Sequence, residues 1–364
     1  MKKLIIAALA LPMLFACDEN NVEPVIPEYE APYQMYVVNE GSWQKNNASI
    51  SAFNTLTPDS NGNDDIYFLR NEQQLGDVAQ DMVYNPVNHC LYVSVSESRY
   101  IAKLNAYGKE LARYSTTEEQ AQPRSLALID GYLYATLFGG MVAKLDTAML
   151  ALQATVKVGT YPEQLASANG VIAVCNSGYS AENTVSIIDL ASFGVKETVV
   201  LPHYNPQHIV ALGNNFYCNT TEYDASWNAV SNIVEIAPSA NTWTASDITE
   251  GFYMMPANGK LYIVKQETNY YTTPYSYINE FKVFDPATRA VDQAFATGNL
   301  ATILADKAIY GLSYCPQNGD IYFCISQQEG YEYVNSTVMA YDVNGNLHNN
   351  KLTGILSKKV VFAE

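Results

Sequence analysis

A short motif recurs seven times along this chain and constrains the fold more than any other feature. Each copy is a run of three strand-forming residues, usually centred on tyrosine, and in most copies a Gly or Asn turn and another apolar run precede it. The central residues are Tyr36, Tyr92, Tyr134, Ala173, Tyr217, Tyr262 and Tyr322, so neighbouring copies lie 39 to 60 residues apart. Repeats of about 40–50 residues built from short β-type runs are typical of propeller blades. The sequence therefore predicts an all-β fold of seven similar units.

Each unit is interpreted as a four-stranded antiparallel blade with strands A to D, in which strand B carries the motif. Strand A has proline near its start in three copies, at Pro123, Pro162 and Pro206, where a missing N–H costs no ladder hydrogen bond. A pair of β-sandwiches could use the same short strands. It would not need the eight-residue spacing between strands A and B that recurs in four copies, as from Leu126 to Tyr134. The spacing favours the propeller, and no stretch shows a convincing helical period.

The first unit lacks a strand A, and the end of the chain has the pattern to supply it. Residues 354–363 match 159–168 in spacing, with Val360 in the position of Leu165. A C-terminal strand that completes the first blade would close the ring and remove two exposed sheet edges. We therefore predict a seven-bladed β-propeller of four-stranded antiparallel blades over residues 34–364, closed by the C-terminal strand.

The N-terminus resembles a secretory signal that ends in a lipobox. Lys2 and Lys3 precede an apolar run that is too short to cross a bilayer and that ends at Cys17. We expect residues 1–16 to be a lipoprotein signal peptide and Cys17 to carry the lipid anchor, followed by an acidic, proline-rich tether over residues 17–33. A plain secretory peptide with an incidental cysteine is the alternative. Acidic residues directly after such a cysteine resemble the surface-export signal of Bacteroidetes lipoproteins, which implies an outer-membrane, cell-surface location. In other Gram-negative lineages an Asp at this position would instead suggest retention at the inner membrane.

Composition narrows the class of ligand. The net charge is −17 with only 16% charged residues, which argues against nucleic acid because a phosphate-binding face needs clustered Lys and Arg. Tyrosine outnumbers phenylalanine 28 to 12, so the aromatic side chains mostly carry a polar tip. Such a surface suits neutral, hydroxyl-rich or amide-rich ligands. The five cysteines after Cys17 show no zinc spacing and are expected to be buried, with one disulfide left open.

Long connections between strands B and C single out one face as functional. They are predicted over residues 39–47, 96–100, 138–140, 176–183, 220–232, 265–277 and 326–335, and every one contains an aromatic residue. The candidate ligand contacts among them are Trp43, Tyr100, Phe138, Tyr179, Tyr223, Trp227, Tyr270, Tyr271, Tyr275, Tyr277, Tyr331 and Tyr333. Any single tyrosine could instead only pack its loop onto the blade.

Residues near the start of each strand A should surround the mouth of a central channel. The candidates from this ring are Arg124, Gln164, His208, Tyr253, Tyr310 and Lys358. No position pairs a nucleophile with a base, so we predict no catalytic residues, no catalytic cofactor and no enzymatic activity. We expect His208 to form hydrogen bonds rather than to bind metal. Residues 59–65 offer alternate oxygen ligands, but a solvated loop is favoured over a calcium site.

The first blade also carries a resemblance to a known family. Met35–Trp43 followed by Asn47–Asn54 resembles the start of the YncE-like surface-lipoprotein propellers of Bacteroidetes, and the similarity extends over most of the chain. Within that group it is most similar to the BtuG-type cobalamin-binding lipoproteins. The resemblance implies a receptor that binds cobalamin or a related corrinoid and delivers it to a TonB-dependent outer-membrane transporter. Tyrosine rings would cover the corrin, and Arg124, Lys358 or Lys359 could meet its phosphate.

Three other functions stay open at this point. A glycan-binding lipoprotein would also use Tyr and Trp for stacking and amides for hydrogen bonds. A propeller lactonase or lyase would need a clustered metal site or an acid–base pair at the channel, which the ring does not supply. An adhesion scaffold is the fourth possibility.

Overall fold

The computed structural model describes residues 32–56, 62–63, 65–224, 228–240, 242–292 and 297–363. The predicted signal peptide, the lipidated Cys17 and nearly all of the tether lie outside the described residues, as do Trp227 and most of the 59–65 loop.

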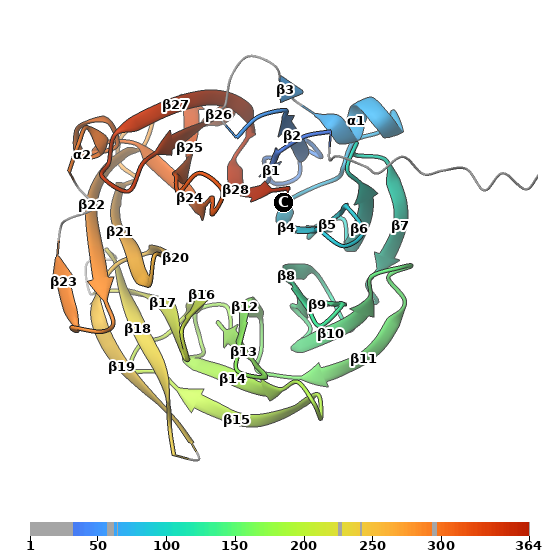
Figure 1. Cartoon of the computed structure of the whole chain (residues 1–364), viewed down its shortest axis with the longest axis vertical. Helices are drawn as coiled ribbons and strands as arrows, with labels where there is room; N and C mark the ends of the chain where they lie inside the picture. Colours follow the sequence, from blue (N-terminus) through green and yellow to red (C-terminus); the bar gives the residue numbers. More distant parts are fainter. Residues whose placement is uncertain are drawn as a thin grey trace, which may run out of the picture. The chain divides into compact units, whose positions relative to one another are not determined.

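Seven four-stranded antiparallel sheets form a ring, which confirms the predicted seven-bladed propeller (Figure 1). Blades are numbered in chain order. Blade 1 contains β28 (Ser357–Phe362), β1 (Met35–Asn39), β2 (Ser49–Phe53) and β3 (Gly62–Asn63). Blade 2 contains β4 (Ala79–Asn85), β5 (Cys90–Val95), β6 (Tyr100–Asn105) and β7 (Glu110–Ser115). Blade 3 contains β8 (Pro123–Ile129), β9 (Tyr132–Leu137), β10 (Met141–Asp146) and β11 (Leu152–Lys157).

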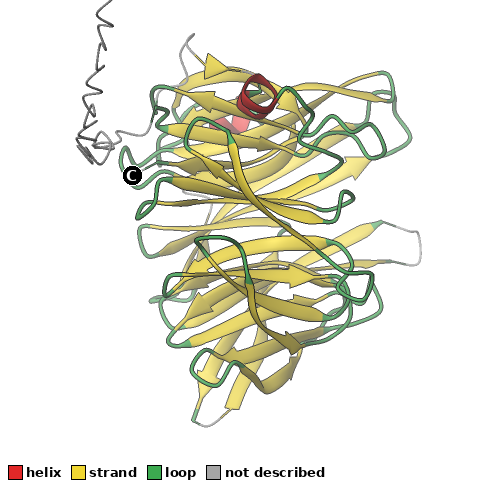
Figure 2. Cartoon of the chain, turned by 90° about the vertical axis from the view of Figure 1, so that its right-hand side faces the viewer, coloured by secondary structure: helices red, strands yellow, loops and turns green. Residues whose placement is uncertain are grey.

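The remaining blades follow the same order from the ring axis outward. Blade 4 contains β12 (Pro162–Ala168), β13 (Val171–Asn176), β14 (Thr184–Asp189) and β15 (Gly194–Val200). Blade 5 contains β16 (Pro206–Leu212), β17 (Asn215–Tyr223), β18 (Ala229–Ser239) and β19 (Thr242–Glu250). Blade 6 contains β20 (Tyr253–Ala257), β21 (Lys260–Asn269), β22 (Ser276–Asp285) and β23 (Ala290–Asp292). Blade 7 contains β24 (Ala308–Tyr314), β25 (Ile321–Glu329), β26 (Glu332–Tyr341) and β27 (Leu347–Ile355). Seen from the side, the strands run between two faces that carry the loops (Figure 2).

The ring closes through the last strand of the chain, as the sequence predicts. β28 pairs antiparallel with β1, and Val360 stands opposite Val37. The first blade is thereby built from both ends of the propeller, and β28 covers the inner edge that β1 would otherwise expose.

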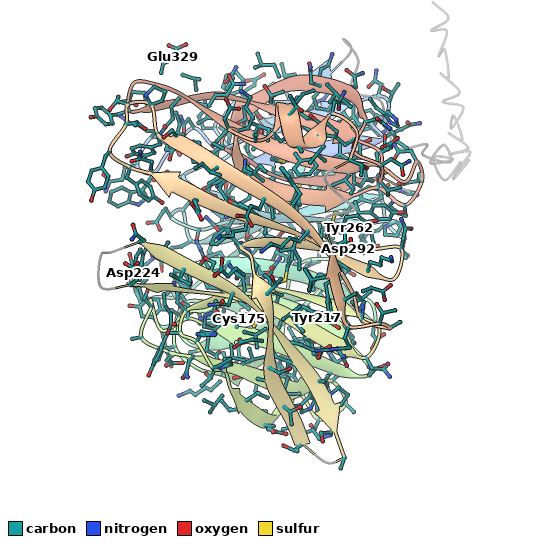
Figure 3. All side chains as sticks on the ribbon, turned by 90° about the vertical axis from the view of Figure 1, so that its left-hand side faces the viewer. Cys175, Tyr217, Asp224, Tyr262, Asp292 and Glu329 are labelled. Atoms are coloured by element: carbon teal, nitrogen blue, oxygen red, sulfur yellow. The ribbon has the colours of Figure 1, made fainter. Side chains whose placement is uncertain are left out.

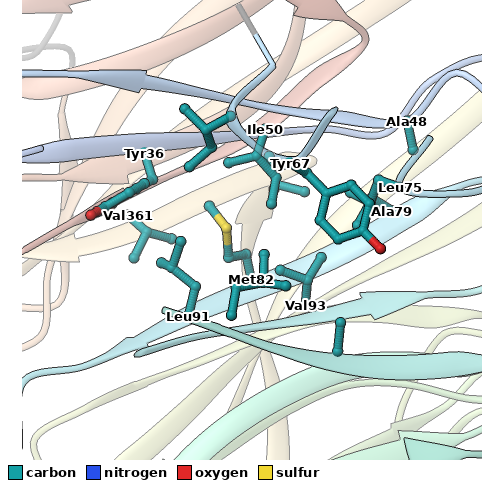
Figure 4. Close-up of a cluster of buried hydrophobic side chains, with 14 of the residues drawn as sticks. Tyr36, Ala48, Ile50, Tyr67, Leu75, Ala79, Met82, Leu91, Val93 and Val361 are labelled. Carbon is teal, nitrogen blue, oxygen red and sulfur yellow. The ribbon is translucent and has the colours of Figure 1, made fainter. Parts of the chain in front are cut away.

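In blades 1 and 2 the repeated tyrosine joins one blade to the next. In blade 1 the Tyr36 ring is fully buried, and its hydroxyl donates to the Ala106 carbonyl of blade 2 at 2.8 Å. Tyr92 donates to Thr147 of blade 3 in the same way, at 2.6 Å. A buried tyrosine needs a partner for its hydroxyl, and the C–D turn of the neighbouring blade provides it. The motif therefore recurs because each blade must bury one face against the next, as Figure 4 shows for Tyr36, Met82 and Leu91 between blades 1 and 2.

Two short helices were not predicted. α1 (Ile66–Asn71) begins after Asp65, whose carboxylate accepts from the backbone N–H groups of Tyr67 and Phe68, each at 3.1 Å. α2 (Leu300–Ile303) spans one turn. Helices this short carry no readable 3.6-residue period, because their position depends on the cap and on packing rather than on an amphipathic stripe.

Three of the predicted loops are in fact continuations of strands. β17 and β18 pair as far as Tyr223 and Ala229, β21 and β22 as far as Asn269 and Ser276, and β25 and β26 as far as Glu329 and Glu332. These hairpins extend past the blade, where water reaches both faces, so their sequence lacks the alternation that marks a half-buried strand. Asp224 and Glu329, at or beside the hairpin ends, lie toward the same face of the molecule (Figure 3).

Candidate functional site

The B–C connections and the starts of strands A meet at one face, which we call the mouth face. Pro123 at the start of β8 pairs with Leu137 at the end of β9, and Phe138 follows directly. The same arrangement joins Pro162 to Asn176 and Pro206 to Thr220. Antiparallel pairing thus brings together the two sets of positions that the sequence analysis proposed.

A β-bulge interrupts the innermost strand of six blades at this face. The register shifts lie at Ala79/Asp81, Pro123/Leu126, Pro162/Leu165, Pro206/Ile209, Ile309/Gly311 and, through the pairing of β1 with β28, at Lys358. The bulges contain the candidates Arg124, Gln164, His208, Tyr310 and Lys358. Bulges re-aim side chains and end regular pairing, and they are common beside functional sites. The predicted ring of mouth residues is therefore a structural feature of the blade.

The cations of the mouth already have carboxylate partners. Lys358 Nζ lies 2.9 Å from Glu40 Oε2 and also donates to Gln80 Oε1 at 2.6 Å. Arg124 Nη2 lies 2.9 Å from Glu163 Oε2. Lys359 is similarly paired with Asp81, at 2.7 Å. The mouth therefore presents balanced charge, and it differs from the free cationic set that a phosphate-binding site would show.

His208 stands in this ring as a neutral imidazole. Its ring centroid lies 5.6 Å from that of Phe252 and 6.1 Å from that of Tyr253. Burial lowers the pKa of His208 to about 4, and the nearby charges of Lys358 and Arg124 act in the same direction. Its backbone N–H donates to the Asn219 side chain at 2.7 Å. The imidazole is therefore unprotonated at neutral pH.

Gln164 serves the scaffold as well as the mouth. Its side-chain oxygen accepts from the Ile209 backbone N–H at 2.9 Å, which ties blade 4 to blade 5. Asp81 plays the corresponding part between blades 2 and 3, where its carboxylate accepts from the Leu126 N–H at 2.8 Å. Candidates of this kind hold neighbouring blades together, and any ligand contact from Gln164 would come from the other half of its amide.

Tyrosines from blades 6 and 7 converge at the mouth face and form what we call the hairpin cluster: Tyr253, Tyr270, Tyr275, Tyr277, Tyr310 and Tyr333. The rings of Tyr270 and Tyr275 meet edge to face at 5.2 Å. Burial raises the pKa of Tyr277 to about 12, with smaller contributions from Tyr333, Tyr270 and Tyr275. The two hairpins touch where the Tyr275 N–H donates to the Gln328 side chain at 3.3 Å.

Hollows lie on both sides of the β25–β26 hairpin. One of about 260 Å³ is lined by Pro274, Tyr275, Tyr277, Asp306, Lys307, Ala308, Ser326, Gln327 and Gln328. The other, of about 440 Å³, is lined by Gln327, Glu329, Tyr333, Val334, Asn335, Leu352 and Ile355. Each hollow is thus bordered by tyrosine and by amide side chains, and this combination suits a ligand with both apolar faces and polar edges.

A second aromatic group lies on blades 3 and 4, and we call it the aromatic strip. It consists of Phe138, Tyr161 and Tyr179, whose ring centroids are 5.4 Å and 5.5 Å apart in that order. The sequence analysis missed Tyr161. The available signal was its place directly before Pro162, at the entry to strand A, which the bulged geometry puts beside the B–C connection.

The structure moves one candidate from the mouth into the core. Tyr100 is only 5% exposed, and its hydroxyl donates to the Leu75 carbonyl. The Arg113 guanidinium lies 3.7 Å from its ring centroid. Tyr100 is the first residue of β6, so its side chain follows the strand pleat inward, and we remove it from the candidate contacts. Trp43, Tyr223, Tyr271 and Tyr331 are exposed, at 64%, 58%, 98% and 72%.

No set of three or more His, Cys, Asp or Glu side chains is arranged to hold a metal ion within the described parts of the chain. The five cysteines of the propeller are all buried. Among the described helices, none has the length and apolar character that crossing a bilayer requires. That the protein is not an enzyme stays a prediction.

Comparisons with known proteins extend the fold evidence. No family model and no curated protein matches the chain. A functionally unknown protein from Desulfotomaculum acetoxidans is similar in structure, with 12% identity and a TM-score of 0.59, covering 91% of this chain and 99% of that one. Hydrazine synthase from Kuenenia stuttgartiensis has 13% identity and a TM-score of 0.56, with 76% and 86% covered. The Pan2 WD40 domain of Neurospora crassa has 10% identity and a TM-score of 0.52, with 78% and 80% covered.

These comparisons identify a fold and not a ligand. At such low identity the shared propeller says nothing about function, because propellers serve many unrelated activities. A functional proposal must therefore come from the mouth face itself.

Proposed function

We propose that this protein is a binding protein for cobalamin or a related corrinoid, which it holds on the mouth face. The observation that carries the proposal is the hairpin cluster, where six tyrosines from two blades lie close to one another and two of them, Tyr275 and Tyr277, line a hollow of about 260 Å³. Seven blades with short, plain loops would form an equally good ring. The additional length of the blade 6 and blade 7 hairpins therefore needs a reason other than folding.

The chemistry of the hairpin cluster favours a large, nearly neutral ligand. Burial raises the pKa of Tyr253, Tyr277, Tyr310 and Tyr333, so these hydroxyls stay protonated and can both donate and accept. The neighbouring cations are matched by carboxylates. A corrinoid is a broad disc with apolar faces and amides along its edge. Tyrosine rings can cover such faces, while hydroxyls and the amides of Gln327 and Gln328 can pair with the edge.

The same proposal includes a place for the protein in the cell. Lipid on Cys17 and an extended tether would hold the propeller at the outer surface of the membrane, where it would deliver its ligand to a TonB-dependent transporter. Labelling of growing cells with a fatty-acid probe tests the anchor. We expect the label on the wild-type protein and none after Cys17→Ser, with the variant released from the membrane fraction. An unlabelled wild-type protein would contradict the anchor.

Ligand binding is tested by isothermal titration of purified protein with cyanocobalamin. We expect a one-to-one complex, and weaker binding by the Tyr275→Ala/Tyr277→Ala variant, because each lost ring removes about 1–3 kcal/mol of stacking by analogy with bases. The matched control is Tyr132→Ala, at the opposite end of blade 3. No heat and no coloured protein after gel filtration would exclude the corrinoid. Binding to a glycan array instead would replace it with a carbohydrate ligand.

A further inference from the structure

Glu40 lies where the ring of mouth residues meets the hairpin cluster. It follows β1 directly, and its backbone is fixed on two sides. Its N–H donates to the Leu356 carbonyl at 2.9 Å, and its carbonyl accepts from the Ala79 N–H of blade 2 at 3.0 Å. The side chain is only 14% exposed. The carboxylate is therefore held in one place before any ligand arrives, which lowers the entropic cost of a contact with it.

The two oxygens of the Glu40 carboxylate are used differently. Oε2 accepts from the Tyr310 hydroxyl at 3.1 Å and from Lys358 Nζ at 2.9 Å. Oε1 accepts from no described residue, and it is not fully buried. An ionised carboxylate has lone pairs but no hydrogen to donate. A ligand group that pairs with Oε1 must therefore be a hydrogen-bond donor.

Three tyrosines of the hairpin cluster are neighbours of this carboxylate. Tyr310 is hydrogen-bonded to it. Burial raises the pKa of Tyr253, and the charge of Glu40 adds to the effect. Burial also raises the pKa of Tyr333, with smaller contributions from nearby groups that include Glu40. Glu40 therefore borders the aromatic surface on which the macrocycle is proposed to lie, at the place where the edge of a disc would pass.

The hairpins around the cluster add negative charge. Residues 265–280, 305–307 and 326–335 contain five acidic and two basic side chains, a formal charge of −3: Glu267, Glu280, Asp306, Glu329 and Glu332 against Lys265 and Lys307. Both lysines already have partners, since Lys265 Nζ lies 3.1 Å from Glu267 and Lys307 Nζ lies 3.0 Å from Asp306. Glu329 stands at the outer end of its hairpin (Figure 3). A further negative charge brought to this face would meet like charges.

We infer that this face selects a ligand whose edge carries uncharged amides and rejects the same edge when it carries carboxylates, with Glu40 as the specificity-determining residue. The inference rests on the proposed function and concerns the side chains around the corrin macrocycle. A primary amide donates to Oε1 and brings no charge. A carboxylate in its place has no hydrogen to donate and is repelled by Glu40 and by the hairpin acids. The protein thus distinguishes a fully amidated corrinoid from one in which a side chain is still an acid.

Derivatives of cyanocobalamin that differ in one side chain test the inference. In the b-, d- and e-monocarboxylic acids one amide is replaced by a carboxylate, and the methyl ester of each acid has neither the charge nor the donor. Affinities are measured by titration at neutral pH for the wild type, for Glu40→Gln and for the control Glu118→Gln. Glu118 is 91% exposed and lies between β7 and β8, so the control removes the same charge away from the hairpins.

The wild type should bind at least one of the acids roughly tenfold or more weakly than cyanocobalamin, because a hydrogen bond to a charged group is lost and a repulsion is gained. The ester of that acid should lie between the two. Glu40→Gln should bind the same acid more tightly than the wild type does, because a glutamine amide can donate to it, and a gain of this kind cannot arise from misfolding. The control should match the wild type.

The outcomes separate the two proposals. Equal affinity of the wild type for cyanocobalamin and all three acids would overturn the inference and leave the proposed function standing. An unchanged preference for the amide in Glu40→Gln would do the same. A wild type that binds none of these corrinoids would refute both.

Discussion

Gly311 provides a sharp test of how the ring is closed. It lies on β24, the innermost strand of blade 7, against β28, the innermost strand of blade 1. A Cβ at this position would lie 1.8 Å from the Lys358 carbonyl oxygen and 2.8 Å from its carbonyl carbon. These are backbone atoms of a paired strand, so Gly311→Ala must push β28 away by more than 1 Å to reach an ordinary contact. Overpacking of this kind costs about 1–3 kcal/mol, and we expect the upper part of that range.

The matched control is Gly194→Ala at the start of β15. There the nearest atom to a Cβ would be the Ser192 hydroxyl oxygen at 3.7 Å, and its φ is not positive. Alanine at that position should be neutral or stabilise by about 0.5 kcal/mol through the unfolded chain. The two variants are compared with the wild type by guanidinium unfolding and by limited proteolysis of the C-terminus. Gly311→Ala should unfold at lower denaturant and release the C-terminal strand first. Equal midpoints for the two variants would refute the packing of β24 against β28.

Three further predictions concern single groups. Burial lowers the pKa of His208 to about 4, against an ordinary value of about 6.5. Between these two pH values the unfolded chain therefore binds a proton on His208 that the folded chain does not. The free energy of unfolding should then fall by about 2–3 kcal/mol as the pH is lowered from about 6.5 to about 4, and the His208→Asn variant should lack this fall. The same dependence of unfolding free energy on pH in both proteins would argue against a buried, neutral His208. Lys359→Met removes the cation that lies 2.7 Å from the Asp81 carboxylate and should lower the free energy of unfolding in denaturant by about 1–2 kcal/mol. The control, Lys157→Met on the exposed face of β11, should leave the free energy of unfolding unchanged. A loss of stability in both variants would indicate a general effect of charge. The five cysteines of the propeller are buried, so iodoacetamide should modify none of these five in the folded, reduced protein and all five in denaturant. Labelling of any of the five in the folded protein would contradict their burial.

The fold could be predicted because the repeat is local in sequence. Each blade must bury one face against the next, so six of the seven copies keep a large residue such as Tyr36 or Tyr92 at the centre of the strand, and four keep the same distance to the strand before it. The closing strand was predicted by the same logic, since Val360 occupies the place that Leu165 has in blade 4. α1 could not be predicted, because six residues capped by Asp65 have no period to detect.

The site was predicted in outline and corrected in detail. The sequence placed the B–C connections and the strand A starts on one face, and the bulges at Arg124, His208 and Lys358 agree with that placement. It did not distinguish Tyr100 from Tyr179, although one is buried and the other is 77% exposed. Tyr100 is the first residue of β6, where the strand pleat turns its side chain inward, whereas Tyr179 lies within the connection between β13 and β14 and reaches water.

By itself the sequence determined the number of blades, the closure of the ring and the face that carries the long connections. Those properties follow from patterns repeated at a short distance along the chain, where burial of one sheet face selects the residue types. Only the tertiary structure decided that the blade 6 and blade 7 connections are hairpins, that Tyr161 stands beside Tyr179, and that the mouth cations are neutralised. Each of these depends on contacts between separate loops or blades, as with Lys358 and Glu40, 318 residues apart, and such distances leave no periodic mark on the sequence.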